Sequence, residues 1–280
     1  IGRKMRELFT PEDGCVWGSF DYSQQEPRIV VHYAIKLGLP GTTDLKNEFD
    51  KEDADFHQIV ADMAKISRTQ AKTINLGLFY GMGKLKLQAE LGLDRMGAKK
   101  LFDEYHAKVP FVRQLSQDLI EFASDNRLLF TLHDRFCRFD KFESTDKHWN
   151  NETNRFDPVP LYTEEKAKQA YQAEVTEKYK DDKIPADYMK HFDRHYVPAF
   201  TYKALNRLIQ GGAADMTKKA MVDLYEKGIL PQIQIHDELC LSIKDDKQAM
   251  EVKQTMERAI PLEVNNKTNY KHGKNWGTIK

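Results

Sequence analysis

The sequence predicts an α+β fold in which an antiparallel sheet is backed by helices. Residues 15–20 (CVWGSF) form an apolar run rich in strand formers that leads into Asp21. In residues 231–243 (PQIQIHDELCLSI), apolar residues alternate on both sides of His236, Asp237 and Glu238. This alternation is typical of a tight hairpin with acids at its tip. The segments between these strands mostly have helical spacing.

Helices are expected along most of the first half of the chain. One runs from Pro27 to Gly38, since proline is tolerated in a first turn and glycine ends helices. Residues 40–55 are predicted to be a loop, and residues 56–66 a short helix that carries His57. Short helices follow over residues 84–125, and the residues expected to separate them are Gly92, Gly97 and Pro110.

The second half is predicted to contain three further helices. Residues 127–139 alternate like a strand, and residues 164–180 form a strongly charged helix whose charges are expected to face solvent. A long helix is expected over residues 202–227, and an amphipathic helix from Asp245 to Ala259 precedes a polar tail.

Length and composition set only broad limits. A chain of 280 residues forms one large domain or two packed subdomains, and its balance of 43 acidic and 43 basic residues does not exclude nucleic-acid binding. The three cysteines have no zinc-site or disulfide spacing, so a reducing, cytoplasmic setting is expected. No apolar run approaches the roughly 18 residues of a membrane span. The chain starts without Met, which suggests a fragment.

The stretch from Ser67 to Gly83 places an unusual stripe on one helix. Arg68, Lys72, Leu76 and Tyr80 recur every four residues, and each step drifts by only about 40° around the helix. Two cations followed by an apolar residue and an aromatic suit a nucleoside triphosphate. Close approach of a ligand or backbone also explains the glycines of this stretch, which are Gly77, Gly81 and Gly83. The alternative is an amphipathic surface helix with solvated cations.

Asp21 and Asp237 each lie where an apolar strand ends or is interrupted. If the two strands pair, their carboxylates converge and suit hard divalent cations, two of which could clamp an in-line phosphoryl transfer. Arg68, Lys72 and His57 could then hold a triphosphate. The alternative for each acid alone is an ordinary turn residue.

Four segments together resemble the motifs of family A DNA polymerases, of the bacterial DNA polymerase I type and with the character of bacteriophage members. They are DYSQQEPR at 21–28, RTQAKTINLGLFYG at 68–81, YKALNRLIQGGAADMTKKAM at 202–221 and IHDEL at 235–239. The resemblance implies the right-hand polymerase fold without its thumb. Residues 1–40 and 202–280 would form the palm, and residues 41–201 the mainly helical fingers and a connecting region.

The resemblance also implies a metal site. Asp21 and Asp237 would be the catalytic carboxylates that bind two Mg²⁺ ions, for which Mn²⁺ could substitute. The carbonyl of Tyr22 would be a further ligand, and Glu238 an acidic neighbour of lesser importance.

The implied nucleotide and DNA contacts surround these acids. Glu26 would be the steric gate against a ribose 2′-OH, Lys72 would also protonate the leaving pyrophosphate, and Tyr80 would close over the new base pair. The full nucleotide-binding set is Gln24, Glu26, His57, Arg68, Lys72, Leu76 and Tyr80. The primer-template contacts would come from Gln24, Arg28, Asn206, Gln210 and His236, several of them in the minor groove.

The sequence departs from the family pattern in three ways. Leu76 stands where the family usually has Phe or Tyr, which predicts altered turnover and weak acceptance of dideoxynucleotides. Gln25 and Pro27 replace more usual apolar residues, a change that we expect to matter little. The segment also begins after the usual thumb, so we expect a poor grip on duplex DNA.

The predicted function is therefore template-directed addition of dNMPs to a primer 3′-OH in DNA replication. The partners would be primer-template DNA, dNTPs and other replisome proteins, in the cytoplasm of a host cell if the gene belongs to a phage, with no membrane involved. Two alternatives stay open at this point. One is a single-subunit RNA polymerase, and the other is a non-catalytic DNA-binding or replisome fragment.

Overall fold

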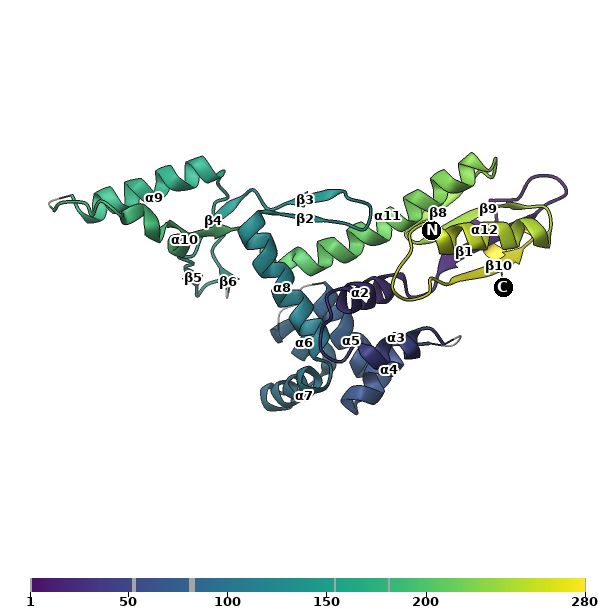
Figure 1. The fold of residues 1–280 in the computed structure, drawn as a ribbon, viewed down its shortest axis with the longest axis horizontal. Helices are drawn as coiled ribbons and strands as arrows, with labels where there is room; N and C mark the ends of the chain where they lie inside the picture. Colours follow the sequence, from purple (N-terminus) through teal and green to yellow (C-terminus); the bar gives the residue numbers. More distant parts are fainter. Residues whose placement is uncertain (1, 52–53, 81–83, 154, 181, 280) are drawn as a thin grey trace. The chain divides into compact units, whose positions relative to one another are not determined.

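The computed structural model describes residues 2–51, 54–80, 84–153, 155–180 and 182–279. The chain divides into two compact units (Figure 1). The first is formed by residues 1–117, 130–135 and 205–280, and the second by residues 118–129 and 136–204. The predicted α+β class is confirmed. Of the motif stretch around Ser67, Gly81 and Gly83 lie outside the described residues.

The first unit contains a four-stranded antiparallel sheet with the order β10-β1-β9-β8. Its strands are β1 (Val16–Tyr22), β8 (Ile233–Ile235), β9 (Glu238–Ile243) and β10 (Thr268–Gly273). The predicted first strand and hairpin are confirmed. The first strand continues to Tyr22, so Asp21 lies within it and not after it.

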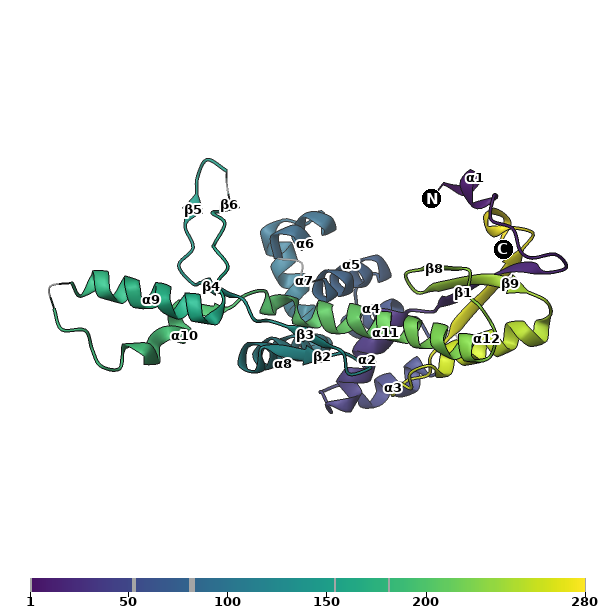
Figure 2. The same cartoon turned by 90° about the horizontal axis from the view of Figure 1, so that it is seen from above.

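One face of this sheet is covered by two helices, α11 (Ala204–Glu226) and α12 (Asp246–Arg258), which run beside it in both views (Figure 1, Figure 2). The strands alternate, so that Phe20, Leu239 and Leu241 point into a shared core and Asp21 and Glu238 point to the other face. Burial of each large apolar side chain contributes about 1.5–3 kcal/mol. The core therefore fixes which face presents the acids. It also contains Met216, Ala220 and Leu224 of α11 and Val252 and Met256 of α12.

The prediction that the chain ends in a polar tail without regular structure is wrong, because residues 268–273 form the edge strand β10. This strand pairs with β1 in a register that places Asn269 opposite Asp21. Tyr270 stacks on Phe20 with ring centroids 4.6 Å apart. Because few of its other side chains are apolar, the segment lacks the pattern that identifies a half-buried strand.

The helices between β1 and α11 follow the predicted order with two exceptions. Residues 40–55 contain an unpredicted helix, whose inner face buries Leu45 and Phe49. Gly97 does not separate two helices, since its N–H donates to the Asp94 side chain at 2.7 Å inside a first turn. The helices are α1 (Arg3–Arg6), α2 (Gln25–Lys36), α3 (Thr43–Phe49), α4 (Phe56–Ala64), α5 (Arg68–Phe79), α6 (Lys84–Leu91), α7 (Arg95–Lys108) and α8 (Pro110–Asn126).

The second unit has an aromatic core of its own. The charged helix α9 (Glu164–Lys178) buries Ala167, Tyr171 and Val175 along one side, so only its remaining surface is solvated. Phe142, Phe192 and Tyr196 complete this core. The other elements from residue 127 to 203, and the last one of the chain, are β2 (Leu128–Phe130), β3 (Phe136–Arg138), β4 (Phe142–Ser144), β5 (Trp149–Asn150), β6 (Arg155–Phe156), η1 (Tyr188–His191), α10 (Phe192–His195), β7 (Tyr196–Pro198), η2 (Thr201–Lys203) and η3 (Trp276–Thr278).

Within the described ranges, no helix has both the length and the apolar character needed to cross a membrane.

Candidate functional site

Two acids converge at one end of the β1–β9 pair. Asp21 lies opposite Glu238 in the antiparallel register, and the backbone N–H of Tyr22 donates to the carbonyl of Asp237 at 3.3 Å. Asp237 belongs to the two-residue turn between β8 and β9, in which His236 has a φ of 53°. Such a left-handed backbone is what a two-residue hairpin turn requires. The predicted pairing of the two acid-bearing strands is confirmed.

The acids at this sheet end repel one another. Burial raises the pKa of Asp21 to about 6, with further contributions from the charges of Asp237 and Glu238 and partial relief from Lys271. The pKa of Asp237 is also raised, chiefly by burial and further by Glu238. Lys271 and His236 offset this negative charge only in part, and a divalent cation would relieve the remaining repulsion.

Glu238 is engaged by its neighbours in the sheet. Its Oε1 accepts a hydrogen bond from Ser19 Oγ at 2.5 Å and another from Cys240 Sγ at 3.2 Å. All three residues lie on the sheet face that carries Asp21. The Glu238 carboxylate is therefore bound to the strands, whereas no side chain of the described residues donates a hydrogen bond to Asp237 at the turn.

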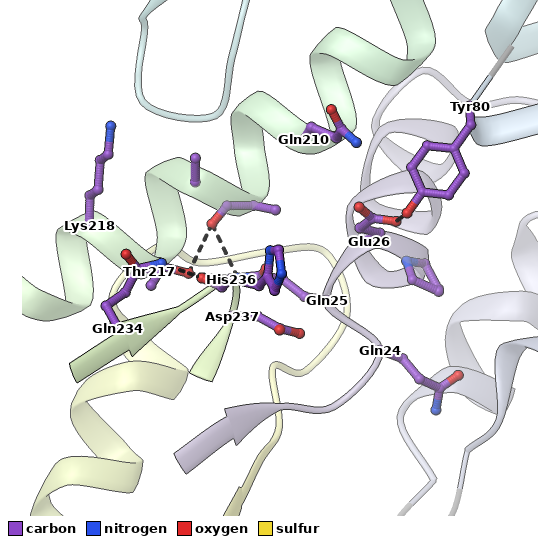
Figure 3. Close-up of a pocket in the computed structure, with 13 residues that line it drawn as sticks. Gln24, Gln25, Glu26, Tyr80, Gln210, Thr217, Lys218, Gln234, His236 and Asp237 are labelled. Carbon is purple, nitrogen blue, oxygen red and sulfur yellow. Dashed lines mark hydrogen bonds between the residues drawn. The ribbon is translucent and has the colours of Figure 1, made fainter. Parts of the chain in front are cut away.

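A cavity of about 710 Å³ opens beside Asp237 (Figure 3). On one wall, Tyr80 Oη donates to Glu26 Oε2 at 2.8 Å. Burial is the main cause that raises the pKa of Glu26, the hydrogen bond from Tyr80 opposes this rise, and the charge of Asp237 adds to it. Burial and the bond to Glu26 raise the pKa of Tyr80 to about 12. The opposite wall is α11, from which Gln210 faces the cavity.

The predicted cationic helix is α5, and Tyr80 is its C-cap residue. Ser67 and Gln70 form a capping box at its start. Arg68 is bound by Asp55, which accepts from Nη2 at 2.6 Å and from Nε at 2.8 Å. Asp55 also caps α4, so it joins the two helices. Lys72 is exposed and has no ion-pair partner within the described part of the chain.

His57 is buried and belongs to a hydrogen-bonded network. Asn75 Oδ1 accepts from Tyr105 Oη at 2.5 Å, which leaves the Asn75 amide N–H₂ to face His57 Nδ1 at 3.2 Å. Burial is the largest of the causes that lower the pKa of His57. Because Nδ1 faces the Asn75 amide N–H₂, the Nε2–H is the donor that His57 can offer to a ligand, and its contact with a triphosphate stays a prediction.

Comparison with known proteins now decides the family. The sequence model of DNA polymerase family A matches residues 1–157 and 149–278, nearly the whole chain. The chain belongs to DNA polymerase family A. The membership that the four motifs predicted is confirmed, and members of this family are generally metal-dependent.

The relatives show how much of a family A protein this chain represents. It is 32% identical over 314 residues to a DNA-directed DNA polymerase of Pseudomonas phage M6, with 97% of this chain and 40% of the relative covered. It is 26% identical over 292 residues to DNA polymerase I of Caldicellulosiruptor bescii, with 100% and 29% covered. The chain thus spans 40% or less of the length of these relatives.

A solved structure supports the fold. The POL domain of Pol1 from M. smegmatis, determined in complex with DNA primer-template and dNTP, superimposes with a TM-score of 0.66 over 98% of this chain and 42% of that chain. The two sequences are 22% identical, so this likeness concerns the fold alone.

Arg28 of the first family A motif does not face the cavity. It is only 1% exposed, Nε donates to Ser23 O at 2.8 Å, Nη1 donates to the Asn265 carbonyl, and the guanidinium lies 4.9 Å from the Phe49 ring centroid. A buried guanidinium cannot reach DNA, so the predicted DNA contact of Arg28 is corrected to a structural role. It fastens the start of α2 to the segment before β10.

The remaining predicted residues divide into two groups. Gln24 lines the cavity, but both ends of its amide are engaged, since Nε2 donates to Ala54 O at 2.7 Å and Oε1 accepts from Phe56 N at 2.8 Å. His236 and Gln210 line the cavity and are exposed. Asn206 and Leu76 are half-buried and do not line it. Gln210 lies inside α11 and is therefore not a helix cap, and His236 is too exposed to be a core histidine.

Sequence reasoning missed four polar residues that line the cavity, which are Gln25, Thr217, Lys218 and Gln234. Lys218 and Thr217 lie on α11, and Gln234 lies on β8, where its Nε2 donates to His236 O at 2.7 Å (Figure 3). A signal existed for Thr217 and Lys218, because they follow Gln210 by seven and eight residues and therefore share its helix face. No spacing rule marks Gln234.

The donor set at the sheet end fits a divalent cation. Two partly buried carboxylates with raised pKa values are oxygen ligands of the kind that Mg²⁺ prefers. No group of three His, Cys, Asp or Glu side chains forms a metal cage among the described residues.

Proposed function

We propose that this chain carries the catalytic centre of a template-directed DNA polymerase, which adds dNMPs from dNTPs to a primer 3′-OH. The observation that supports this most is the convergence of Asp21 and Asp237 beside a cavity walled by Glu26, Tyr80 and Gln210. Residues 1–40 and 202–280 would act as the palm, and residues 41–201 as the fingers and a connecting region.

Asp21 and Asp237 would hold two Mg²⁺ ions, with the Tyr22 carbonyl as a further ligand and Mn²⁺ as a possible substitute. When bound, the ions would activate the primer 3′-OH and stabilise the charge that develops at the transferred phosphate. The side chain of Tyr22 stays clear of this chemistry, since its hydroxyl donates to Met256 O at 2.7 Å in the core. Glu238 would add negative charge without direct coordination, because Ser19 and Cys240 bind its carboxylate.

The nucleotide would lie between α5 and the acids. Lys72 would contact the triphosphate and donate a proton to the leaving pyrophosphate, and Arg68 would join it after leaving Asp55. Glu26 would exclude a ribose 2′-OH, because its hydrogen bond with Tyr80 holds the carboxylate at the cavity wall. Tyr80 would then cover the new base pair.

The primer-template would contact the opposite side of the cavity. Gln210 and His236 are exposed there and would bind the primer end, while Lys218 supplies a positive charge for a phosphate. Asn206 lies one turn before Gln210 on α11 and would reach the duplex further along. Other replisome proteins and a cytoplasmic setting in a phage-infected host complete the proposal, in keeping with the phage relative.

A primer-extension assay with Mg²⁺ tests the proposed activity. Asp237→Ala should lower the rate by about 100-fold or more, because the ion loses a charged ligand. Asp140→Ala, at an exposed acid between β3 and β4, is the matched control and should retain the rate.

Two outcomes would contradict the proposal. Extension with NTPs in preference to dNTPs would favour an RNA polymerase. Binding of primer-template DNA without extension, by both the unmodified chain and Asp237→Ala, would favour a non-catalytic fragment.

A further inference from the structure

Gln25 forms a buried polar contact between two helices that wall the cavity. It begins α2 and is 4% exposed, and Thr217 on α11 is 2% exposed. Gln25 Nε2 donates to Ala213 O at 3.2 Å and lies 3.4 Å from Thr217 Oγ1 (Figure 3). The polar residue that stands here in place of the more usual apolar one therefore has polar partners on α11.

Gln25 Nε2, Thr217 Oγ1 and the Ala213 carbonyl are joined by hydrogen bonds. Thr217 Oγ1 donates its own proton to Ala213 O at 3.2 Å, which leaves its lone pairs to accept from Gln25. Because buried donors and acceptors must be paired, this arrangement admits one relative position of α2 and α11. Two apolar side chains in the same place would tolerate sliding, since dispersion contacts have no direction.

The contact of Gln25 with α11 lies next to residues of both cavity walls. Glu26 follows Gln25 directly on α2, and Gln210 precedes Ala213 by about one turn on α11. Both line the cavity. Any shift of α2 along α11 would change the separation of Glu26 from Gln210.

We propose that Gln25 and Thr217 form a polar interlock that fixes the separation of the Glu26 and Gln210 walls and thereby sets how closely the cavity fits the sugar of an incoming nucleotide. The second half of this statement rests on the proposed polymerase function. Gln25 and Thr217 act through Glu26 as positioning residues and do not touch the reacting atoms.

Hydrogen exchange of the free chain tests the interlock without any need for activity. Gln25→Leu should make amides of α2 and of residues 205–220 exchange at least about threefold faster, because the contact that joins the two helices is lost. Thr217→Val should have a smaller effect, since the Ala213 carbonyl remains. The double variant should exchange no faster than Gln25→Leu, since residues in one network are not additive.

Two matched controls accompany these variants. Thr217→Ser keeps the hydroxyl and should restore unmodified exchange. Gln58→Leu makes the same chemical change on α4, where the amide binds only the exposed Asp62 at 2.8 Å, and should leave α2 unchanged.

Sugar discrimination tests the consequence. The ratio of kcat/KM for dATP over ATP should fall by about three- to tenfold in Gln25→Leu and by about twofold in Thr217→Val, because small displacements of a pocket wall weaken rejection of a hydroxyl. Thr217→Ser and Gln58→Leu should retain the ratio. A role in general folding alone would lower both kcat/KM values together.

The outcomes separate the two proposals. If Gln25→Leu and Thr217→Val left hydrogen exchange unchanged, or if their effects added in the double variant, the interlock would be overturned. If exchange became faster but the ratio of kcat/KM for dATP over ATP stayed the same, the role of the interlock in fitting the sugar would be overturned. If the unmodified chain extends no primer, the proposed function fails and the exchange data alone judge the interlock.

Discussion

The two charged regions of the proposed site are built in opposite ways. At the sheet end, Asp21 and Asp237 are partly buried, repel each other and have raised pKa values. On α5, the cation Arg68 is half exposed and already bound to Asp55 at 2.6 Å. The charge of the acids is therefore offset only in part by nearby cations, whereas Arg68 has an ion-pair partner and is half exposed to solvent.

Because of this difference, the sheet end and α5 would bind their ligands in different ways. In the proposed site, cations at the sheet end would relieve a repulsion that the folded state already contains. A triphosphate at α5 would have to displace Asp55 from Arg68, whereas Lys72 has no ion-pair partner to give up among the described residues. The following changes test this contrast in order of expected effect.

Asp21→Asn should have the largest effect, a loss of primer extension of about 100-fold or more, because a neutral amide is a poor ligand for a divalent cation. The same change should stabilise the metal-free fold at pH 7.5. The pKa of Asp21 is raised to about 6 in the folded chain. Ionised Asp21 therefore destabilises the fold, and the contribution of Asp21 to stability falls as pH rises from about 4 through 6.

Thermal unfolding from pH 4 to 7.5 without divalent cations measures how much ionised Asp21 destabilises the fold. The two chains should have similar stability near pH 4, where the Asp21 carboxyl is protonated, and Asp21→Asn should be the more stable at pH 7.5. Asp140→Asn serves as the control. If the thermal stability of the unmodified chain and of Asp21→Asn changed in parallel with pH, ionisation of Asp21 would not destabilise the fold.

Lys72→Met should lower kcat/KM for dNTPs by about 10- to 100-fold, because a charged donor to the triphosphate is removed. Single-turnover kinetics with increasing dNTP measures the loss. Lys86→Met, on the exposed side of α6, is the matched control. A loss that high dNTP concentration fully restores would leave Lys72 a binding role only.

Leu76→Tyr should raise incorporation of dideoxynucleotides relative to dNTPs by about tenfold, because the phenol supplies a ring and a hydroxyl that leucine lacks. Competitive incorporation of ddTTP and dTTP measures the ratio. Leu85→Tyr at an 81% exposed position on α6 controls for an added phenol. Equal use of both nucleotides by the unmodified chain would contradict the premise.

Asp55→Asn should have the smallest effect, a fall in KM for dNTPs of at most about fivefold, because exposed ion pairs contribute about 0.2–1 kcal/mol. The amide oxygen keeps an acceptor for the start of α4, so the helix cap persists. Steady-state kinetics at low salt measures the change, with Asp62→Asn on α4 as control. A higher KM would mean that Asp55 positions Arg68 and does not compete for it.

Local patterns predicted the acid-bearing elements well. Alternating apolar residues around Asp237 and the run before Asp21 indicated strands, and the four-residue spacing of Arg68 and Lys72 indicated their helix. β10 was not predictable in this way, because an edge strand with polar side chains carries little periodicity.

Within the site, the burial of polar side chains is the feature that the sequence did not predict. Nothing near Arg28 in the sequence indicates that its partner carbonyl comes from Asn265, and nothing near His57 indicates Asn75 and Tyr105. These contacts arise from the tertiary fold, which decides whether a cation or a histidine faces a ligand. Motif spacing alone cannot show it.

The sheet order also has a consequence for how the chain folds. Both neighbours of β1, which are β9 and β10, come more than 200 residues later in the chain. Such long-range pairing is slow to form, because the intervening chain must be ordered before the contacts stabilise it. During synthesis on the ribosome, β1 therefore remains without these partners until β9 has been made, and Asp21 can meet Asp237 only after that.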